Sequence, residues 1–133
     1  MLTENRRKIL ETISGSPVPM HAREVYIALN EDINLATVYR AVNFLEKRGL
    51  IEGFTFSCSD EGTVRYFFSA GHGHTHFFHC TRCHSFTGLK ECSLDSLIKR
   101  FEEKNGHQVD THVMYLSGIC RDCREKQARE VEI

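Results

Sequence analysis

The first 50 residues carry an apolar pattern that predicts three short helices. Apolar residues recur every three or four positions after Thr3, after His21 and after Asn34, which places them on one face of each helix. Thr3 and Asn34 are common helix caps, and Glu24 stands where a capping-box acid belongs, although His21 is a poor substitute for a hydroxyl cap. Gly49 suits the end of the third helix. Two helices joined by a short turn predict a helix-turn-helix.

Residues 50–70 change to the alternating pattern of a β-hairpin. Apolar positions alternate through Phe54 and Phe56, stop at a polar turn, and alternate again from Val64. A hairpin directly after a helix-turn-helix is the wing of a winged helix. We therefore expect a winged-helix DNA-binding domain over residues 1–70.

Residues 71–133 mix strand-like and helical patterns and predict a small α/β domain. We expect a strand over 86–89, a helix capped by Ser93, and a strand over 108–117. The charged tail from Arg124 is expected to fray. The predicted fold class is α+β with two domains.

Two Cys-x-x-Cys motifs dominate the chemistry of this second domain. Cys80 and Cys83 form the first, and Cys120 and Cys123 form the second. Four thiolates complete a tetrahedral shell, which suits a structural Zn²⁺ rather than a catalytic one with an open position. Buried cysteines would not explain the paired spacing, and disulfides require an oxidising compartment.

The chain shows no signal peptide and no stretch long enough to span a membrane. We therefore expect a cytoplasmic protein without a membrane partner, in a reducing setting that favours metal over disulfide for its six cysteines. Each half is small for apolar burial alone, and a structural metal is a common remedy.

Net charge does not indicate nucleic-acid binding by itself. The chain carries 17 Lys and Arg against 18 Asp and Glu, and neither half is a polycation. The local signal is on the third helix, where Thr37, Tyr39, Arg40 and Asn43 fall away from the apolar face. Such side chains suit phosphates and base edges in the major groove, although a solvated helix face has the same pattern.

A second metal site is suggested by histidines at period two. His72, His74 and His76 share one face of an extended strand, and imidazole ligands suit Zn²⁺ and Fe²⁺. Cys58 near the wing tip is either a small apolar residue or a ligand, and Cys92 is either structural filler or an extra ligand.

Asp95 and His112 have ordinary explanations within this pattern. Asp95 lies in the first turn of the predicted helix, where a carboxylate complements the helix dipole. His112 lies on an apolar face, where a single histidine is usually a core residue.

The chain resembles the ferric-uptake-regulator family from Leu2 to Cys123. The resemblance is carried by LATVYR at 35–40, by Phe44-Leu45, by GLI at 49–51, by the histidine-rich strand before Cys80-x-x-Cys83, and by the run Tyr115-Leu116-x-Gly118-x-Cys120 with Cys123.

The resemblance implies a homodimeric, metal-dependent regulator that binds double-stranded operator DNA. It matches the four knuckle cysteines to the family's structural zinc ligands. It matches His74, His76, Asp95 and His112 to the second metal site, and so gives the last two a metal-binding role. Thr37, Tyr39 and Arg40 match residues that approach DNA.

The chain departs from the family pattern at the hinge-side sensing site. Pro19, Thr75 and Phe77 stand where that site usually has histidines. The site is therefore absent or rebuilt, and the spare donors that could rebuild it are His72, Cys58 and His21.

The expected function is repression of metal-uptake genes at palindromic operators when Fe²⁺ or Zn²⁺, or Mn²⁺, fills the regulatory site. The alternative is a peroxide or redox sensor of the same fold, in which a ligand histidine or a cysteine is oxidised. We expect no enzyme and no organic substrate, because the His-x-Glu and Pro-Cys-x-x-Cys signature of zinc deaminases is missing.

Overall fold

The computed structural model describes residues 2–58, 60, 62–70, 76–89, 92 and 94–131. The chain divides into two compact units, Met1–Gly73 and His74–Ile133. Each unit contains both helices and strands, which confirms the predicted α+β class.

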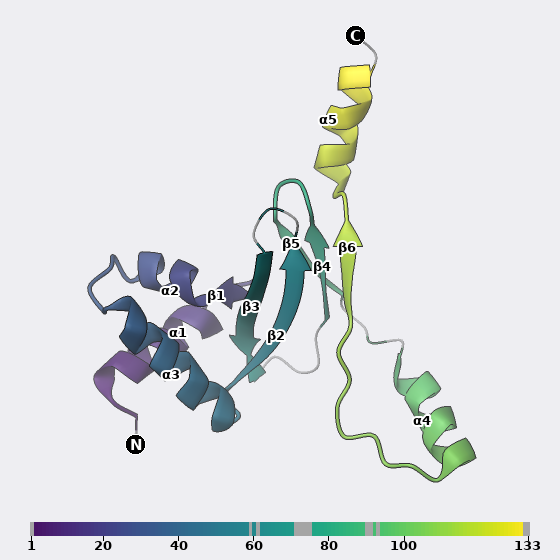
Figure 1. Cartoon of the computed structure of the whole chain (residues 1–133), viewed down its shortest axis with the longest axis horizontal. Coiled ribbons are helices and arrows are strands. Elements are labelled where there is room, and N and C mark those ends of the chain that lie inside the picture. Colours follow the sequence, from purple (N-terminus) through teal and green to yellow (C-terminus); the bar gives the residue numbers. More distant parts are fainter. Residues whose placement is uncertain are drawn as a thin grey trace. The chain divides into compact units, whose positions relative to one another are not determined.

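The N-terminal unit is a winged helix of three helices and a three-stranded antiparallel sheet in the order β1-β3-β2 (Figure 1). Its elements are α1 (Glu4–Ser14), β1 (Met20–His21), α2 (Ala22–Ala28), α3 (Leu35–Lys47), β2 (Ile51–Cys58) and β3 (Gly62–Ser69). The helices and the hairpin were predicted from the sequence. The two-residue strand β1 was not, because it is too short to show an alternating pattern.

Side-chain caps set the beginning of each of these helices. Thr3 Oγ1 accepts the backbone N–H three residues on at 3.3 Å, and Asn34 Oδ1 does the same at 3.0 Å. His21, a poor cap by composition, forms a complete capping box: its Nδ1 accepts the Glu24 N–H at 3.2 Å, and its own N–H donates to Glu24 Oε1 at 3.1 Å. Gly49 adopts φ 74°, as expected of a residue that ends a helix.

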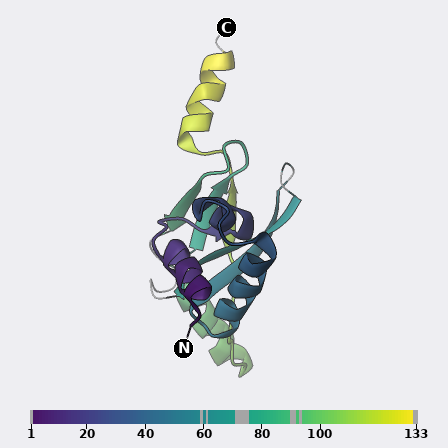
Figure 2. The same cartoon turned by 90° about the vertical axis from the view of Figure 1, so that its left-hand side faces the viewer.

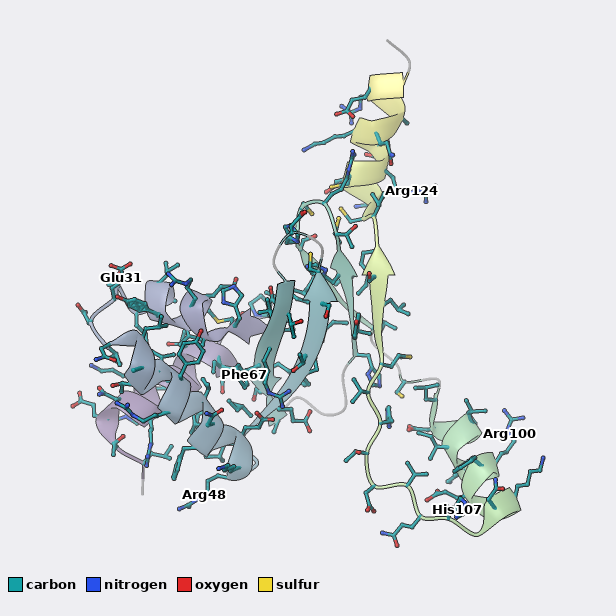
Figure 3. The ribbon with its side chains drawn as sticks, viewed as in Figure 1. Glu31, Arg48, Phe67, Arg100, His107 and Arg124 are labelled. Carbon is teal, nitrogen blue, oxygen red and sulfur yellow. The ribbon has the colours of Figure 1, made fainter. Side chains whose placement is uncertain are left out.

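One apolar core joins the three helices to the sheet. Helices α1 and α3 lie side by side (Figure 2), and Phe67 of β3 points toward the helices from the sheet (Figure 3). The buried members of this core are Ile9, Ile13, Ala22, Val25, Ile33, Val38, Ala41, Val42, Leu45, Ile51 and Phe67. The face of α3 opposite this core is left for solvent or a partner.

An ion pair attaches the wing to α3. The Arg65 guanidinium on β3 donates to both carboxylate oxygens of Glu46 and to Thr55 Oγ1 at 2.9 Å. Gly53 leaves room for it, because a Cβ there would lie 3.0 Å from the guanidinium. The hairpin is thereby held against the C-terminal half of the helix.

The C-terminal unit has a mixed sheet in the order β5-β4-β6, in which β4 pairs antiparallel with β5 and parallel with β6. Its elements are β4 (His76–Cys80), β5 (Phe86–Leu89), α4 (Leu94–Asn105), β6 (Tyr115–Gly118) and α5 (Arg121–Val131). No helix in the described part of the chain is long and apolar enough to cross a membrane.

Two predictions for this unit were wrong. The strand expected over 108–117 is confined to β6, because alternation supplies no hydrogen-bonding partner and pairing with β4 begins only at Tyr115. The tail expected to fray forms α5, since its Glu, Lys, Arg, Gln and Ala residues are strong helix formers.

Helix α4 contributes no buried residue to the unit, although its sequence is amphipathic. Leu97 and Phe101 on this helix remain 53% and 47% exposed. Figure 1 shows α4 set away from the sheet of its own unit.

Replacing Ile9 by Ala should destabilise the N-terminal unit by about 2–5 kcal/mol, because Ile9 is fully buried and the surrounding core cannot collapse onto the cavity. The matched control is Ile27→Ala on α2, whose side chain is 58% exposed and whose loss should cost less than about 1 kcal/mol. Urea unfolding followed by circular dichroism measures both. Equal losses for the two variants would contradict the described core.

Candidate metal centres and DNA-facing helix

The four knuckle cysteines come together at one end of the β4–β6 strand pair. Cys80 ends β4 and lies opposite Gly118 of β6 in the parallel register, so the second motif begins two residues beyond that pairing. The four Sγ atoms all lie within 4.8 Å of one another. Strand pairing therefore joins two motifs that are distant in the sequence.

The first knuckle is a closed turn after β4. The Cys80 N–H donates to the Ser85 carbonyl at 3.0 Å, and the His84 N–H donates back to the Cys80 carbonyl at 2.9 Å. His84 has φ 62°, in the left-handed region that non-glycine residues seldom adopt. This turn brings the Cys83 sulfur back toward the Cys80 sulfur.

The four thiols do not share one protonation state. Burial raises the pKa of the Cys80 thiol, but backbone N–H groups of Cys120 and Cys83 donate to its sulfur at 3.4 and 3.5 Å and lower its pKa to about 6. Hydrogen bonds from Ser85 lower the pKa of Cys83. The pKa of Cys123 rises to about 12, because its thiol hydrogen-bonds to Cys120 and is buried beside the other sulfurs. Four thiolates this close repel one another unless a cation lies among them.

The donor set fits a tetrahedral zinc ion. Zn–S bonds of about 2.3 Å at tetrahedral angles separate neighbouring sulfurs by about 3.8 Å. The Cys83 and Cys120 sulfurs are 3.7 Å apart, and none of the six cysteines, all of which the structure describes, is in a disulfide. Cys80, Cys83, Cys120 and Cys123 would hold the ion, and it would join β4, β6 and α5 at one point.

A second cluster of metal-binding side chains lies at the other end of β4. His76 begins the strand, His112 lies three residues before β6, and Cys92 lies between β5 and α4. The Nε2 atoms of His76 and His112 are 3.0 Å apart. The Cys92 Sγ atom lies 3.3 Å from His76 Nε2 and 3.6 Å from His112 Nε2. The sequence pattern left Cys92 open between filler and ligand.

The tautomer of His76 is set by a carbonyl group. His76 Nδ1 lies 3.0 Å from the Met114 carbonyl oxygen, which can only accept, so Nδ1 carries the proton in the neutral ring. Its Nε2 lone pair then faces His112 and Cys92. A metal-binding histidine usually donates its other ring N–H to an oxygen acceptor in this way, which fixes its tautomer and ring orientation.

The other predicted metal ligands lie elsewhere or cannot be placed. Asp95 is exposed in the first turn of α4, and it is not among the described donors that cluster with His76. His21 is used as the helix cap of α2, and Cys58 ends β2 as a buried residue paired with Gly62. The predicted ligands His72 and His74 lie outside the described residues.

The predicted DNA-facing residues lie on the outer side of α3. Tyr39 is 51% exposed and Arg40 is also exposed, while Thr37 is half-buried. Arg40 Nη2 donates to Thr37 Oγ1 at 3.2 Å, which holds the guanidinium near the N-terminal half of the helix. Phenol, guanidinium and hydroxyl groups there can contact phosphates and base edges.

Zinc binding by the metal-free protein should release protons between pH 7 and 9. The Cys123 thiol, with a pKa of about 12, must lose its proton to bind zinc, whereas Cys80, with a pKa of about 6, is already ionised. For each proton released, the apparent affinity for zinc rises about tenfold when the pH rises by one unit. Calorimetry in buffers of different ionisation enthalpy counts these protons, with Cys58→Ser as the control. Unchanged affinity between pH 7 and 9 would contradict the four-cysteine site.

Known proteins are similar to this chain over most of its length. The model of the "Ferric uptake regulator family" matches residues 1–117. The ferric uptake regulation protein of Bordetella parapertussis is 32% identical over 124 residues, covering 90% of this chain and 86% of the relative. That of Neisseria meningitidis is 29% identical over 132 residues, covering 96% and 89%.

A solved structure gives the same result. The ferric uptake regulator of Vibrio cholerae, whose structure is described as revealing a rearrangement of its DNA-binding domains, superposes with a TM-score of 0.72 at 30% identity, covering 90% of this chain and 92% of that one. The named relatives are ferric uptake regulators. This chain belongs to the ferric uptake regulator family.

Proposed function

We propose that this protein is a metal-responsive transcriptional repressor that binds palindromic operator DNA as a homodimer and controls metal uptake. The observation that carries the proposal is the combination, in one chain, of a winged helix with exposed Tyr39 and Arg40 and two separate clusters of metal-binding side chains. Family membership supports it. We place the protein in the cytoplasm with its DNA target.

The four-cysteine cluster is proposed as the structural zinc site. It offers four sulfur donors and no open position, which suits an ion that stabilises the fold. The second cluster is proposed as the regulatory site, with His76 and His112 as ligands. By family position His74 and Asp95 are further candidates for that site, and Fe²⁺, Zn²⁺ and Mn²⁺ are the candidate metals. Among the described donors, Cys92 and not Asp95 clusters with the two histidines. A rebuilt hinge-side site using His72, Cys58 or His21 stays a prediction as well.

The regulatory metal can favour operator binding only through a higher affinity for the DNA-binding conformation. Coupling of this kind is typically about 1–3 kcal/mol, or about 5- to 150-fold in DNA affinity. His76 and His112 come from β4 and from the segment before β6, so an ion bound there links two separate stretches of the C-terminal unit.

The homodimer is supported by apolar surface that the C-terminal unit leaves uncovered. No residue of α4 is fully buried in a single chain, and Val113 is 75% exposed. Among the described residues of this unit, the exposed large apolar side chains are Leu97, Phe101, Val113, Tyr115 and Leu116. Contiguous exposed apolar surface usually marks an interaction site, and Leu97 and Phe101 lie four residues apart on one face of α4. Two-fold symmetry would pair two recognition helices with a palindrome.

DNA binding should require both metal and Arg40. The affinity for a duplex selected from random sequences, measured by fluorescence anisotropy, should be about 5- to 150-fold higher with the correct metal than with a chelator. Arg40→Ala should cost about 1–3 kcal/mol of that binding. Arg100→Ala on α4 (Figure 3), outside the winged helix, should leave it unchanged. Equal affinity with Fe²⁺, Zn²⁺, Mn²⁺ and chelator would end the proposal.

Placing a charge on the exposed apolar surface should split the dimer. Leu116→Glu puts a carboxylate into the proposed contact and should shift sedimentation at micromolar concentration toward the monomer. Ile27→Glu is the matched control, because Ile27 is also exposed but belongs to the N-terminal unit. A Leu116→Glu protein that sediments like the wild type, or a monomeric wild type with zinc bound, would refute the proposed contact.

A further inference from the structure

We propose that the Cys92 thiolate, and not the Asp95 carboxylate, is the third protein ligand of the second metal site, and that this site selects Zn²⁺ over Mn²⁺. Metal binding by Cys92 is inferred from the distances between the donor atoms. Regulation by the bound metal makes the proposed function more specific and rests on it.

The three donor atoms form a triangle of the size that one zinc ion requires. With Zn–N bonds of about 2.05 Å and a Zn–S bond of about 2.3 Å at tetrahedral angles, nitrogens lie about 3.3 Å apart and nitrogen and sulfur about 3.6 Å apart. The observed separations are 3.0 Å between the imidazoles and 3.3 and 3.6 Å from Cys92 to His76 and His112. A single cation at the centre reaches all three.

Hydrogen bonding among the three groups explains the cluster less well. The Met114 carbonyl holds the proton of His76 on Nδ1, so His76 presents one lone pair at Nε2. His112 Nε2 and Cys92 Sγ both approach that nitrogen, and one lone pair directs a good hydrogen bond to only one of them. A cation would instead use a lone pair from each of the three atoms.

Asp95 occupies a position that serves the helix. It lies in the first turn of α4 with an exposed side chain, and a carboxylate there complements the positive end of the helix dipole. Cys92, two residues before α4 begins, is half-buried beside His76, which is only 6% exposed. The partly buried group, and not the exposed one, meets the imidazoles.

Ligand chemistry then decides the metal. A thiolate with two imidazoles suits Zn²⁺, whereas carboxylate and water oxygens suit Mn²⁺. The three described donors leave one tetrahedral position open.

The test uses full-length protein with one zinc per chain at the four-cysteine site, titrated with Co²⁺. A thiolate ligand gives bound Co²⁺ a sulfur-to-cobalt charge-transfer band in the near ultraviolet. The wild type should bind one Co²⁺ with this band while metal analysis still finds its zinc. Cys92→Ser should lose the band and weaken Co²⁺ and Zn²⁺ binding about tenfold or more. Asp95→Asn should retain both the band and the affinity.

Several results would overturn the assignment: no Co²⁺ bound beside the zinc in the wild type, a full band in Cys92→Ser with zinc retained, or loss of binding in Asp95→Asn. Cys92→Asp provides the selectivity test, because an oxygen ligand should move the Zn²⁺ to Mn²⁺ preference toward Mn²⁺. An unchanged ratio of the two affinities would also contradict the proposal.

Operator binding separates this inference from the proposed function. If Cys92→Ser responds to zinc as the wild type does, the ligand assignment fails and the regulator stands. If no metal changes DNA binding by the wild type while the cobalt band depends on Cys92, the regulator fails and the metal site stands.

Discussion

The parallel pairing of β4 with β6 is the constraint on which both metal centres depend. One end of β4 supplies Cys80 to the four-cysteine cluster, and the other end supplies His76 to the second cluster. The segment after β6 supplies Cys120 to the four-cysteine cluster, and the segment before β6 supplies His112 to the second cluster. The strand spans about 13 Å between the two sites. A slip of one residue would turn every side chain of the slipped strand to the opposite face and separate the donors in both clusters.

The pairing of β4 with β6 connects the proposed structural ion to the proposed regulatory ion. A zinc ion held by the four sulfurs would fix the register of β4 and β6 at one end. The fixed register would in turn position the histidines at the other end, where the donors are fewer. Removal of the first ion should therefore weaken metal binding at the second site, and by linkage an ion at the second site should tighten binding at the first. A metal that joins separated segments of a small unit also offsets the limited apolar surface that such a unit buries.

The two units differ in how they are stabilised. The N-terminal unit has a continuous apolar core beneath α1, α2 and α3, and Arg65 attaches its wing to α3. The C-terminal unit buries few apolar side chains, fully buries no residue of α4, and places its sulfur and nitrogen donors at the ends of a small sheet. An N-terminal unit with its own apolar core is consistent with a DNA-reading module of the proposed regulator. A C-terminal unit with little core is consistent with a module that metal ions and a second copy of the chain complete.

Features that depend on neighbouring residues can be read from the sequence alone. Helix periodicity, the caps at Thr3 and Asn34, the wing hairpin and the paired spacing of the four cysteines are all local, because each depends on residues a few positions apart. The sequence also led to the family, through motifs spread along the chain.

Features that depend on distant segments follow only from how the chain folds. The alternation over 108–117 predicted a long strand, but only the residues facing β4 have a hydrogen-bonding partner. Cys92 had no informative spacing, and family position favoured Asp95 as a ligand. Folding brings Cys92, and not Asp95, to His76 and His112, because a ligand's proximity is set by where the chain turns between β5 and α4 and not by its distance along the sequence.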